Sequence, residues 1–171
     1  MELAEAYKFC PRCGNKATLK PRHLSCPDCG LDTYFNPKPV VSVLLRNSKG
    51  EYLFSQRGEE PSKGLYDFPG GFLEEGESFE TAAYREIKEE LGIKLDKIKF
   101  LGTYSETYLS QGLNYSLVGV AYTADLADDA IIKPADDVAA VKFFSLDNFP
   151  KDELAGPSEL EIIEDLRKLR T

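Results

Sequence analysis

The run from Gly71 to Ile93 constrains the fold of this chain more than any other part, because it joins a glycine turn to an amphipathic helix with clear ends. Residues 79–91 are predicted to be helical, since Ser78 can cap the first turn and Gly92 can close the last one. One face of this helix is apolar and carries Ala83, Ile87 and Leu91. Such a helix buries one side in a core and presents polar side chains on the other.

Three glutamates share the polar side of this predicted helix at positions i, i+3 and i+4: Glu86, Glu89 and Glu90. Their side chains lie within an arc of about 100°, where like charges repel unless a cation stands between them. Hard oxygen ligands suit Mg²⁺ or Mn²⁺. A solvated acidic helix face is the other interpretation of this spacing. The adjacent Gly70 and Gly71, where backbone can come close to a ligand, favour the metal site.

The fixed positions of the run follow the pattern G-x5-E-x7-R-E-U-x-E-E-x-G-U, in which U is an aliphatic residue. They are Gly71, Glu77, Arg85, Glu86, Ile87, Glu89, Glu90, Gly92 and Ile93. Through this pattern the chain resembles the Nudix hydrolases, and the preceding segment from Gly64 resembles the family's usual approach to it, with Tyr66 where a Trp is common. The resemblance covers residues 34–171. It implies an α+β or α/β fold, namely an α/β/α sandwich with a mixed sheet.

The resemblance also implies an activity, the hydrolysis of a nucleoside diphosphate linked to another moiety by a metal-activated water. The implied ligands of Mg²⁺ or Mn²⁺ are three carboxylates and one backbone carbonyl, those of Glu86, Glu89, Glu90 and Gly70. Arg85 and Glu77 would form an ion pair that ties the loop to the helix and orients the carboxylates. An ordinary surface pair is the alternative interpretation of these two residues.

The general base is not fixed by the resemblance. Glu90 is one candidate, and Asp137, before a predicted strand, matches a position where the family often carries a Glu. Glu106 is a third candidate. For Asp137 and Glu106 a solvated loop carboxylate is the competing interpretation. Arg57, at the end of a predicted strand, is expected either to contact a substrate phosphate or to cap the sheet edge.

All four cysteines lie in two similar segments, Cys10-Pro-Arg-Cys13-Gly and Cys26-Pro-Asp-Cys29-Gly. Such paired knuckles predict a structural zinc ribbon, because four thiolates complete a tetrahedral shell and each trailing glycine allows a tight turn. Disulfides and thioredoxin-like redox chemistry are the competing interpretations. His23, between the knuckles, is expected to be a loop residue rather than a ligand.

A zinc ribbon ahead of a Nudix domain resembles the NADH pyrophosphatases, which would predict NADH, NAD⁺ or NAD-capped RNA as substrate. Those enzymes carry an S-Q-P-W-P-F-P-x-S stretch after the run, whereas this chain has Ser105 to Tyr115 there and no tryptophan. We therefore expect ADP-ribose or another NAD(H)-like nucleoside diphosphate derivative as substrate. A nucleoside triphosphate pyrophosphohydrolase and a non-catalytic nucleotide or RNA sensor are the alternatives. Tyr104, Tyr108 and Tyr115 are available to stack a base, or else pack in the core.

The remaining pattern predicts two domains, a zinc ribbon over residues 1–33 and a Nudix domain over 34–171, joined by a stiff linker at 36–39. The predicted elements are strands at 40–46, 51–57, 98–108, 115–124 and 138–145, a hairpin turn at 47–50, a polar loop at 58–64, and a last helix from a capping box at 157–161 to near 169.

Composition agrees with a compact cytoplasmic enzyme that acts on a nucleotide-derived small molecule. The chain has 171 residues, of which 42% are hydrophobic, and its formal net charge is -8. It contains neither an apolar run long enough for a bilayer nor a signal segment, so no membrane is expected. The basic residues near its start are dispersed, which makes nucleic acid the weaker partner expectation. A homodimer is one of the oligomeric states left open.

Overall fold

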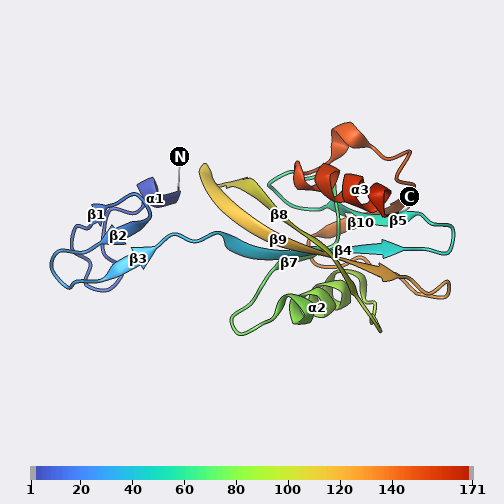
Figure 1. Ribbon diagram of the computed structural model, residues 1–171, viewed down its shortest axis with the longest axis horizontal. Helices are drawn as coiled ribbons and strands as arrows, with labels where there is room; N and C mark the ends of the chain where they lie inside the picture. The colour runs from blue at the N-terminus through green and yellow to red at the C-terminus, as the bar shows by residue number, and fades with distance from the viewer. Residues whose placement is uncertain (1–2, 170–171) are drawn as a thin grey trace. The chain divides into compact units, whose positions relative to one another are not determined.

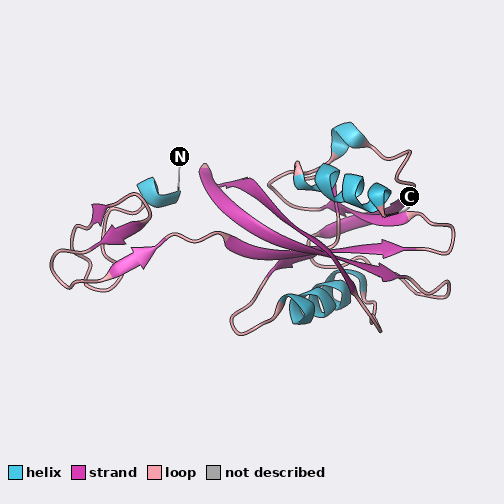
Figure 2. Ribbon diagram, viewed as in Figure 1, coloured by secondary structure: helices cyan, strands magenta, loops and turns pink. Residues whose placement is uncertain are grey.

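The computed structural model describes residues 3–169 and forms two compact units. The first unit reaches Lys38 and includes Thr107–Leu117, whereas the second comprises Pro39–Glu106 and the chain from Val118 onward. The outer ends of the two predicted domains, residues 1 and 171, lie outside the described residues. Helices and strands of both units are distinguished in Figure 2.

The second unit is built on a seven-stranded sheet in the order β10-β5-β4-β9-β8, with β6 paired to β5 and β7 paired to β4. The strands are β4 Lys38–Arg46, β5 Tyr52–Arg57, β6 Tyr66–Asp67, β7 Gly70–Phe72, β8 Lys99–Ser110, β9 Leu113–Asp125 and β10 Val138–Phe144. The helices are α2 Phe79–Leu91, the 3-10 turn η1 Lys151–Glu153 and α3 Ser158–Lys168. Helices α2 and α3 cover opposite faces of the sheet (Figure 1). This is the predicted α/β/α sandwich.

The sheet is mixed because β4 and β9 run in the same direction. At the end of β9, Leu126 N donates to Arg46 O at 2.8 Å, which joins it to the end of β4. At the other end, Gly119 lies beside Val40 near the start of β4. By contrast, β4 pairs with β5 and β7 in antiparallel fashion. The predicted mixed sheet is therefore confirmed.

Two hydrophobic clusters fill the spaces between the sheet and its helices, and β4 contributes to both. Val43 and Leu45 pack with Ile87 and Leu91 on the α2 side. The intervening Leu44 points to the α3 side, where the second cluster includes Phe54, Ile162 and Ile163. Side chains of a strand alternate between its two faces, so a strand buried on both faces is apolar throughout. Truncating one of these buried leucines to Ala is expected to cost about 2–5 kcal/mol of folding free energy.

Helix α2 has the predicted ends. Ser78 Oγ accepts from Thr81 N at 3.2 Å, and Gly92 adopts a left-handed φ of 68° that closes the last turn. For α3 the predicted capping box is wrong, because Pro157 takes the cap position without a side-chain hydrogen bond. Ser158 is the first helical residue, and its hydroxyl donates instead to Glu106 Oε2 at 2.8 Å.

The other predicted elements are found with shifted ends. Strand β4 begins at Lys38, inside the segment expected to be a linker. Its pairing with β7 runs from Val40 to Ser42, and Leu73 N donates to Pro39 O at 3.3 Å just before it. Strands β8 and β9 extend beyond residues 108 and 115, and they meet in a tight turn in which Gln111 and Gly112 have φ values of 52° and 78°. The short β6 and β7 were not predicted, since two or three residues carry no alternation pattern.

The first unit contains α1 Leu3–Ala6 and a small antiparallel sheet in the order β1-β2-β3. Its strands are β1 Thr18–Leu19, β2 His23–Ser25 and β3 Asp32–Tyr34. Strands β1 and β2 form the short hairpin between the two cysteine knuckles. His23 is a strand residue rather than a loop residue, and its ring packs on Tyr34 with centroids 5.0 Å apart. Within residues 3–169, no helix combines the length and apolarity needed to cross a membrane.

Candidate functional site

The two glycines before α2 are needed for close packing within the protein. A Cβ atom on Gly70, whose φ is 149°, would overlap the carbonyl oxygen of Val41 on the paired strand. A Cβ atom on Gly71 would lie 2.5 Å from Oε1 of Glu86. Gly70 therefore allows β7 to join the sheet, and Gly71 leaves room for the carboxylate of Glu86. The sequence predicted these glycines for a different purpose, the close approach of the backbone to a ligand.

Arg85 binds the loop before α2 to the glutamates of the helix. Its Nε and Nη2 donate to the two carboxylate oxygens of Glu77, each at 2.8 Å. Its Nη1 donates to Glu86 Oε1 at 2.8 Å and to Glu89 Oε2 at 3.0 Å, while Nη2 also donates to Phe72 O at 3.0 Å. These contacts use every N–H of the guanidinium. The ion pair between Arg85 and Glu77 is therefore part of a larger hydrogen-bonded network. An ordinary surface ion pair has no such additional contacts.

The three glutamates of the helix differ in burial. Glu86 and Glu90 are only 8% and 4% exposed, whereas the side chain of Glu89 is 51% exposed. Glu90 turns toward β7, where Gly70 N donates to its Oε2 at 3.0 Å. The helix thus holds two carboxylates between itself and the sheet, and it leaves the third at the surface.

Burial and mutual repulsion make this site strongly unfavourable for negative charge. Burial, followed by the charges of Asp137, Glu86 and Asp67, raises the pKa of Glu90 to about 9. Burial likewise raises the pKa values of Glu86 and Asp67, although Arg85 and Arg57 oppose this. A group of carboxylates in such surroundings gains stability from a bound cation, because the cation offsets both effects.

Asp137 is brought to the same place by the segment that follows β9. Ala135 N donates to Glu90 O at 2.8 Å, which fixes this segment on the last turn of α2. Gly58 N donates to Asp137 O at 2.6 Å, which fixes it to the end of β5. The structure therefore brings Asp137 close to Glu90, although the two residues lie far apart in the sequence.

Asp67 is a site residue that the sequence analysis did not single out. Its Oδ1 accepts from Ser55 Oγ at 2.6 Å, and its Oδ2 accepts from Arg57 Nη1 at 2.9 Å. Arg57 Nε also donates to Pro61 O at 2.8 Å. The sheet-edge interpretation of Arg57 is wrong, because β5 is an interior strand. Arg57 instead forms an ion pair with Asp67. The only feature of the sequence that could have indicated a role for Asp67 was its position just before the two glycines.

The tyrosines and the third base candidate lie elsewhere. Tyr104 is buried in the α3-side cluster and its hydroxyl donates to Asp165 Oδ2 at 3.0 Å, so it packs in the core rather than stacking a base. Tyr108 and Tyr115 belong to the first unit, where the ammonium of Lys38 lies 4.4 Å from the ring centre of Tyr115. Glu106 lies beside the first turn of α3, where it accepts from Ser158.

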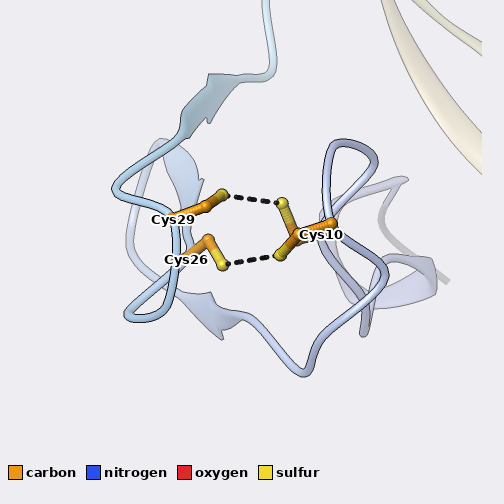
Figure 3. A group of neighbouring side chains, drawn as sticks. Cys10, Cys26 and Cys29 are labelled. Atoms are coloured by element: carbon orange, nitrogen blue, oxygen red, sulfur yellow. Dashed lines mark hydrogen bonds between the residues drawn. The ribbon is translucent and has the colours of Figure 1, made fainter.

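The sulfur atoms of the four cysteines all lie within 4.8 Å of one another in the first unit. Figure 3 labels three of these residues, Cys10, Cys26 and Cys29. Sγ of Cys10 is 3.6 Å from that of Cys29, and Sγ of Cys13 is 3.6 Å from that of Cys26. Each knuckle closes in the same way. Gly14 N donates to Cys10 O at 2.9 Å and Gly30 N donates to Cys26 O at 3.0 Å, with both glycines at positive φ. The cluster can hold one metal ion, and the four residues are free thiols.

Comparison with known families gives a direct result. A family model described as the NUDIX domain matches residues 36–166. The chain belongs to the NUDIX family. The predicted resemblance to Nudix proteins is thereby confirmed for this part of the chain.

Several relatives of this Nudix chain are named NAD-capped RNA hydrolase NudC. The protein of Pseudomonas aeruginosa (strain LESB58) is 28% identical over 145 residues, which cover 84% of this chain and 49% of the relative. The protein of Haemophilus influenzae (strain PittGG) is 31% identical over 153 residues, which cover 88% of this chain and 55% of the relative. The chain thus spans about half the length of these relatives.

Solved structures share the fold. A NUDIX hydrolase from Nitrosomonas europaea has a TM-score of 0.71 at 24% identity, covering 92% of this chain and 89% of the other. The NUDIX domain of Shewanella oneidensis NrtR, solved in complex with ADP ribose, has a TM-score of 0.64 at 27% identity, covering 81% of this chain and 91% of the other. The first likeness supports the fold alone. The second adds a similar domain that binds ADP ribose.

Proposed function

We propose that this chain is a Nudix pyrophosphohydrolase that hydrolyses the diphosphate linkage of ADP-ribose or an NAD(H)-like nucleotide and releases a mononucleotide. The observation that carries the proposal is the cluster formed by the buried carboxylates of Glu86 and Glu90 with the half-buried Asp137 near Glu90, in which Arg85 holds Glu86 in place. Such a cluster is costly to build in a folded protein, so it is best explained by a cation that it is made to bind.

The donor set fits Mg²⁺ or Mn²⁺. Carboxylate oxygens of Glu86, Glu89 and Glu90, with the carbonyl of Gly70, would hold the ion, and only oxygen donors are offered. When bound, the ion would activate a water and offset charge on the diphosphate. Burial of Glu86 and Glu90 keeps these side chains from relaxing into solvent.

The chain's own residues have separate roles in this proposal. Arg85 is a positioning residue, because each of its donors is engaged with the loop or with a glutamate. Glu90 and Asp137 are the two candidates for taking the proton of the attacking water, since the two carboxyl groups are electrostatic neighbours. Burial raises the pKa of Glu90, so this residue would be ionised and able to accept a proton only when a bound cation offsets that effect.

The substrate class follows from two lines of support. Relatives named NAD-capped RNA hydrolase NudC and a similar domain bound to ADP ribose both concern nucleotides that carry a diphosphate. The chain lacks the tryptophan-containing stretch that marks NADH pyrophosphatases, and this favours ADP-ribose over NADH. Arg57 is bound to Asp67, so we do not assign it to a phosphate.

We also propose that residues 1–33 form a zinc ribbon and residues 34–171 the hydrolase domain. Zn²⁺ bound by four sulfurs at about 2.3 Å places those sulfurs about 3.8 Å apart in a tetrahedron. The observed separations of 3.6 Å for two of the pairs are close to this value. The ion would hold the two knuckles together, since the strands β1, β2 and β3 are only two or three residues long.

The test is product analysis of the purified chain with Mg²⁺ or Mn²⁺. ADP-ribose, NAD⁺, NADH, NAD-capped RNA and nucleoside triphosphates would be compared for wild type, Glu90→Gln and the control Glu164→Gln, which alters an exposed glutamate on α3. We expect AMP from ADP-ribose or an NAD(H)-like substrate, with turnover lost only in Glu90→Gln. Pyrophosphate from a triphosphate would instead support a nucleoside triphosphate pyrophosphohydrolase, and binding without turnover would support a sensor.

A further inference from the structure

We propose that Glu159, together with Glu106, forms a specificity-determining acceptor site for an amino group that the substrate carries on a planar carbon, such as the amine of a nucleobase or the carboxamide of nicotinamide. This inference rests on the proposed function, because it assigns the part of the nucleotide that the site would read. Neither residue belongs to the carboxylate cluster of α2, and both lie in the second unit.

Glu159 is singled out by an unmet hydrogen bond. It is 8% exposed, and its Oε2 is the one buried side-chain nitrogen or oxygen among the described residues that has no hydrogen-bond partner. Buried polar atoms in native proteins are almost always paired, and an exception calls for an explanation such as an absent ligand. An unpaired carboxylate oxygen requires a donor, because an ionised carboxylate can only accept.

The unpaired oxygen lies near Glu106. A Cβ atom on Gly156 would lie 2.8 Å from Glu106 Oε2 and 3.1 Å from Glu159 Oε2, so both oxygens face the same side of this glycine. Glu106 is half-buried and is held there by the hydroxyl of Ser158. Any side chain at position 156 would come too close to both carboxylates unless they moved.

The position of Gly156 is itself fixed. Ala155 N donates to Tyr66 O at 2.8 Å, and Leu154 forms an isolated bridge with Tyr66. The segment before α3 is therefore attached to β6, the strand that carries Asp67. Asp67 is an electrostatic neighbour of both Glu159 and Glu90, so the pair lies near the carboxylates proposed to bind the metal.

The negative charge around Glu159 also limits which ligand groups can bind there. Burial, with repulsion from Glu106 and Asp67, raises the pKa of Glu159 to about 7. A diphosphate or a base carbonyl would add to this repulsion, so neither fits here.

An amino group on a planar carbon meets the requirement. It offers two N–H donors and no charge, and its two hydrogens diverge so that one can reach each of two separated acceptors. Adenine and cytosine carry such a group on the ring, and nicotinamide carries one in its carboxamide. A site that hydrogen-bonds such a group rejects an analogue that lacks it, since the buried acceptor is then left unpaired.

The experiment compares three dinucleotides as substrates of the full chain: NAD⁺, its hypoxanthine analogue, which lacks the adenine amine, and its 3-acetylpyridine analogue, in which a methyl group replaces the carboxamide amine without a change of charge. For wild type we expect kcat/KM to fall about 10- to 100-fold for one of the two analogues, the range expected for one hydrogen bond to a charged group. The analogue affected identifies the source of the amino group.

Glu159→Ala should lower kcat/KM for NAD⁺ to the level of that analogue and leave the analogue itself within about threefold of wild type. Glu161→Gln, an exposed change on the same helix, is the matched control and should keep the wild-type discrimination. Glu159→Gln has nearly the size of the native side chain and tests the site if the alanine variant does not fold.

Two outcomes would overturn the inference. One is equal turnover of all three dinucleotides by wild type. The other is an equal loss of activity on all three dinucleotides in a Glu159 variant. That result would mean that the carboxyl groups of Glu159 and Glu106 stabilise the structure and do not read the substrate. If wild type turns over neither these dinucleotides nor ADP-ribose, the proposed function fails instead. Calorimetric binding of the same three compounds then tests the acceptor site independently, and equal affinities would reject it.

Discussion

Replacing Gly71 with Ala should disable the α2 carboxylate cluster while leaving the fold in place. The added Cβ would lie 2.5 Å from Glu86 Oε1, 2.8 Å from its Cδ and 3.1 Å from its Oε2. All three contacts are too short, so the carboxylate must move by about 1 Å to reach ordinary van der Waals distance. It cannot do so and keep its bond to Arg85 Nη1, which is 2.8 Å long.

The expected magnitudes follow from this displacement. Loss of one charge-assisted hydrogen bond costs about 1.5–3 kcal/mol of stability. Misplacing a group of the reaction site by about 1 Å lowers kcat by about 100-fold. Turnover should therefore fall far more than stability.

The assay measures kcat on ADP-ribose with Mn²⁺ and thermal unfolding by circular dichroism. Gly50→Ala is the matched control, because Gly50 lies in the β4–β5 turn with a φ of 80° and its replacement costs about 1 kcal/mol through backbone strain alone. We expect both variants to unfold at lower temperature and only Gly71→Ala to lose turnover. Wild-type kcat in folded Gly71→Ala would refute the argument that Glu86 must occupy its observed position.

Other predictions concern separate parts of the chain. Gly70→Ala should prevent folding, since its Cβ would overlap the carbonyl oxygen of Val41, and expression with limited proteolysis would detect this. Arg85→Lys should lower kcat at least tenfold although the charge is kept, because a lysine cannot reproduce the forked contacts. Cys26→Ser should reduce the zinc content measured by elemental analysis and leave the first unit sensitive to protease. Glu159→Gln should match wild type in stability near pH 4 and exceed it by up to about 3 kcal/mol above pH 7. The pKa of Glu159 is raised from 4.5 to about 7 in the folded state, so native stability falls as pH rises through this window, as denaturation at several pH values would reveal.

Local patterns account for the parts of the fold that were predicted from sequence. Helix α2 was predicted at its observed ends because Ser78 and Gly92 act on the turns next to them. The strand cores were predicted because apolar runs and turns are short-range signals. The capping box of α3 failed because Ser158 had a distant competitor, the carboxylate of Glu106, which sequence separation conceals.

The site was predictable only where it is continuous in sequence. The glutamates of α2 and their arginine lie within one short run, so their proximity follows from helix geometry. Asp67 and Glu159 were missed because their importance depends on burial and on neighbours contributed by other elements. Tyr104 is the opposite case, a residue expected at the site that lies in the core. The sequence does not indicate which side of the sheet an aromatic residue on a strand will face until the register of that strand is known.

The engagement of every N–H of Arg85 has a consequence for metal affinity. Glu86 and Glu89 are oriented by this side chain whether or not an ion is present, so their rotamers are already restricted in the apoprotein. The entropy of ordering these ligands is then lost during folding and not during binding. The relative affinities for Mg²⁺ and Mn²⁺ should accordingly be governed by how readily each ion loses its bound water. One ion could then replace the other without reordering these two ligands.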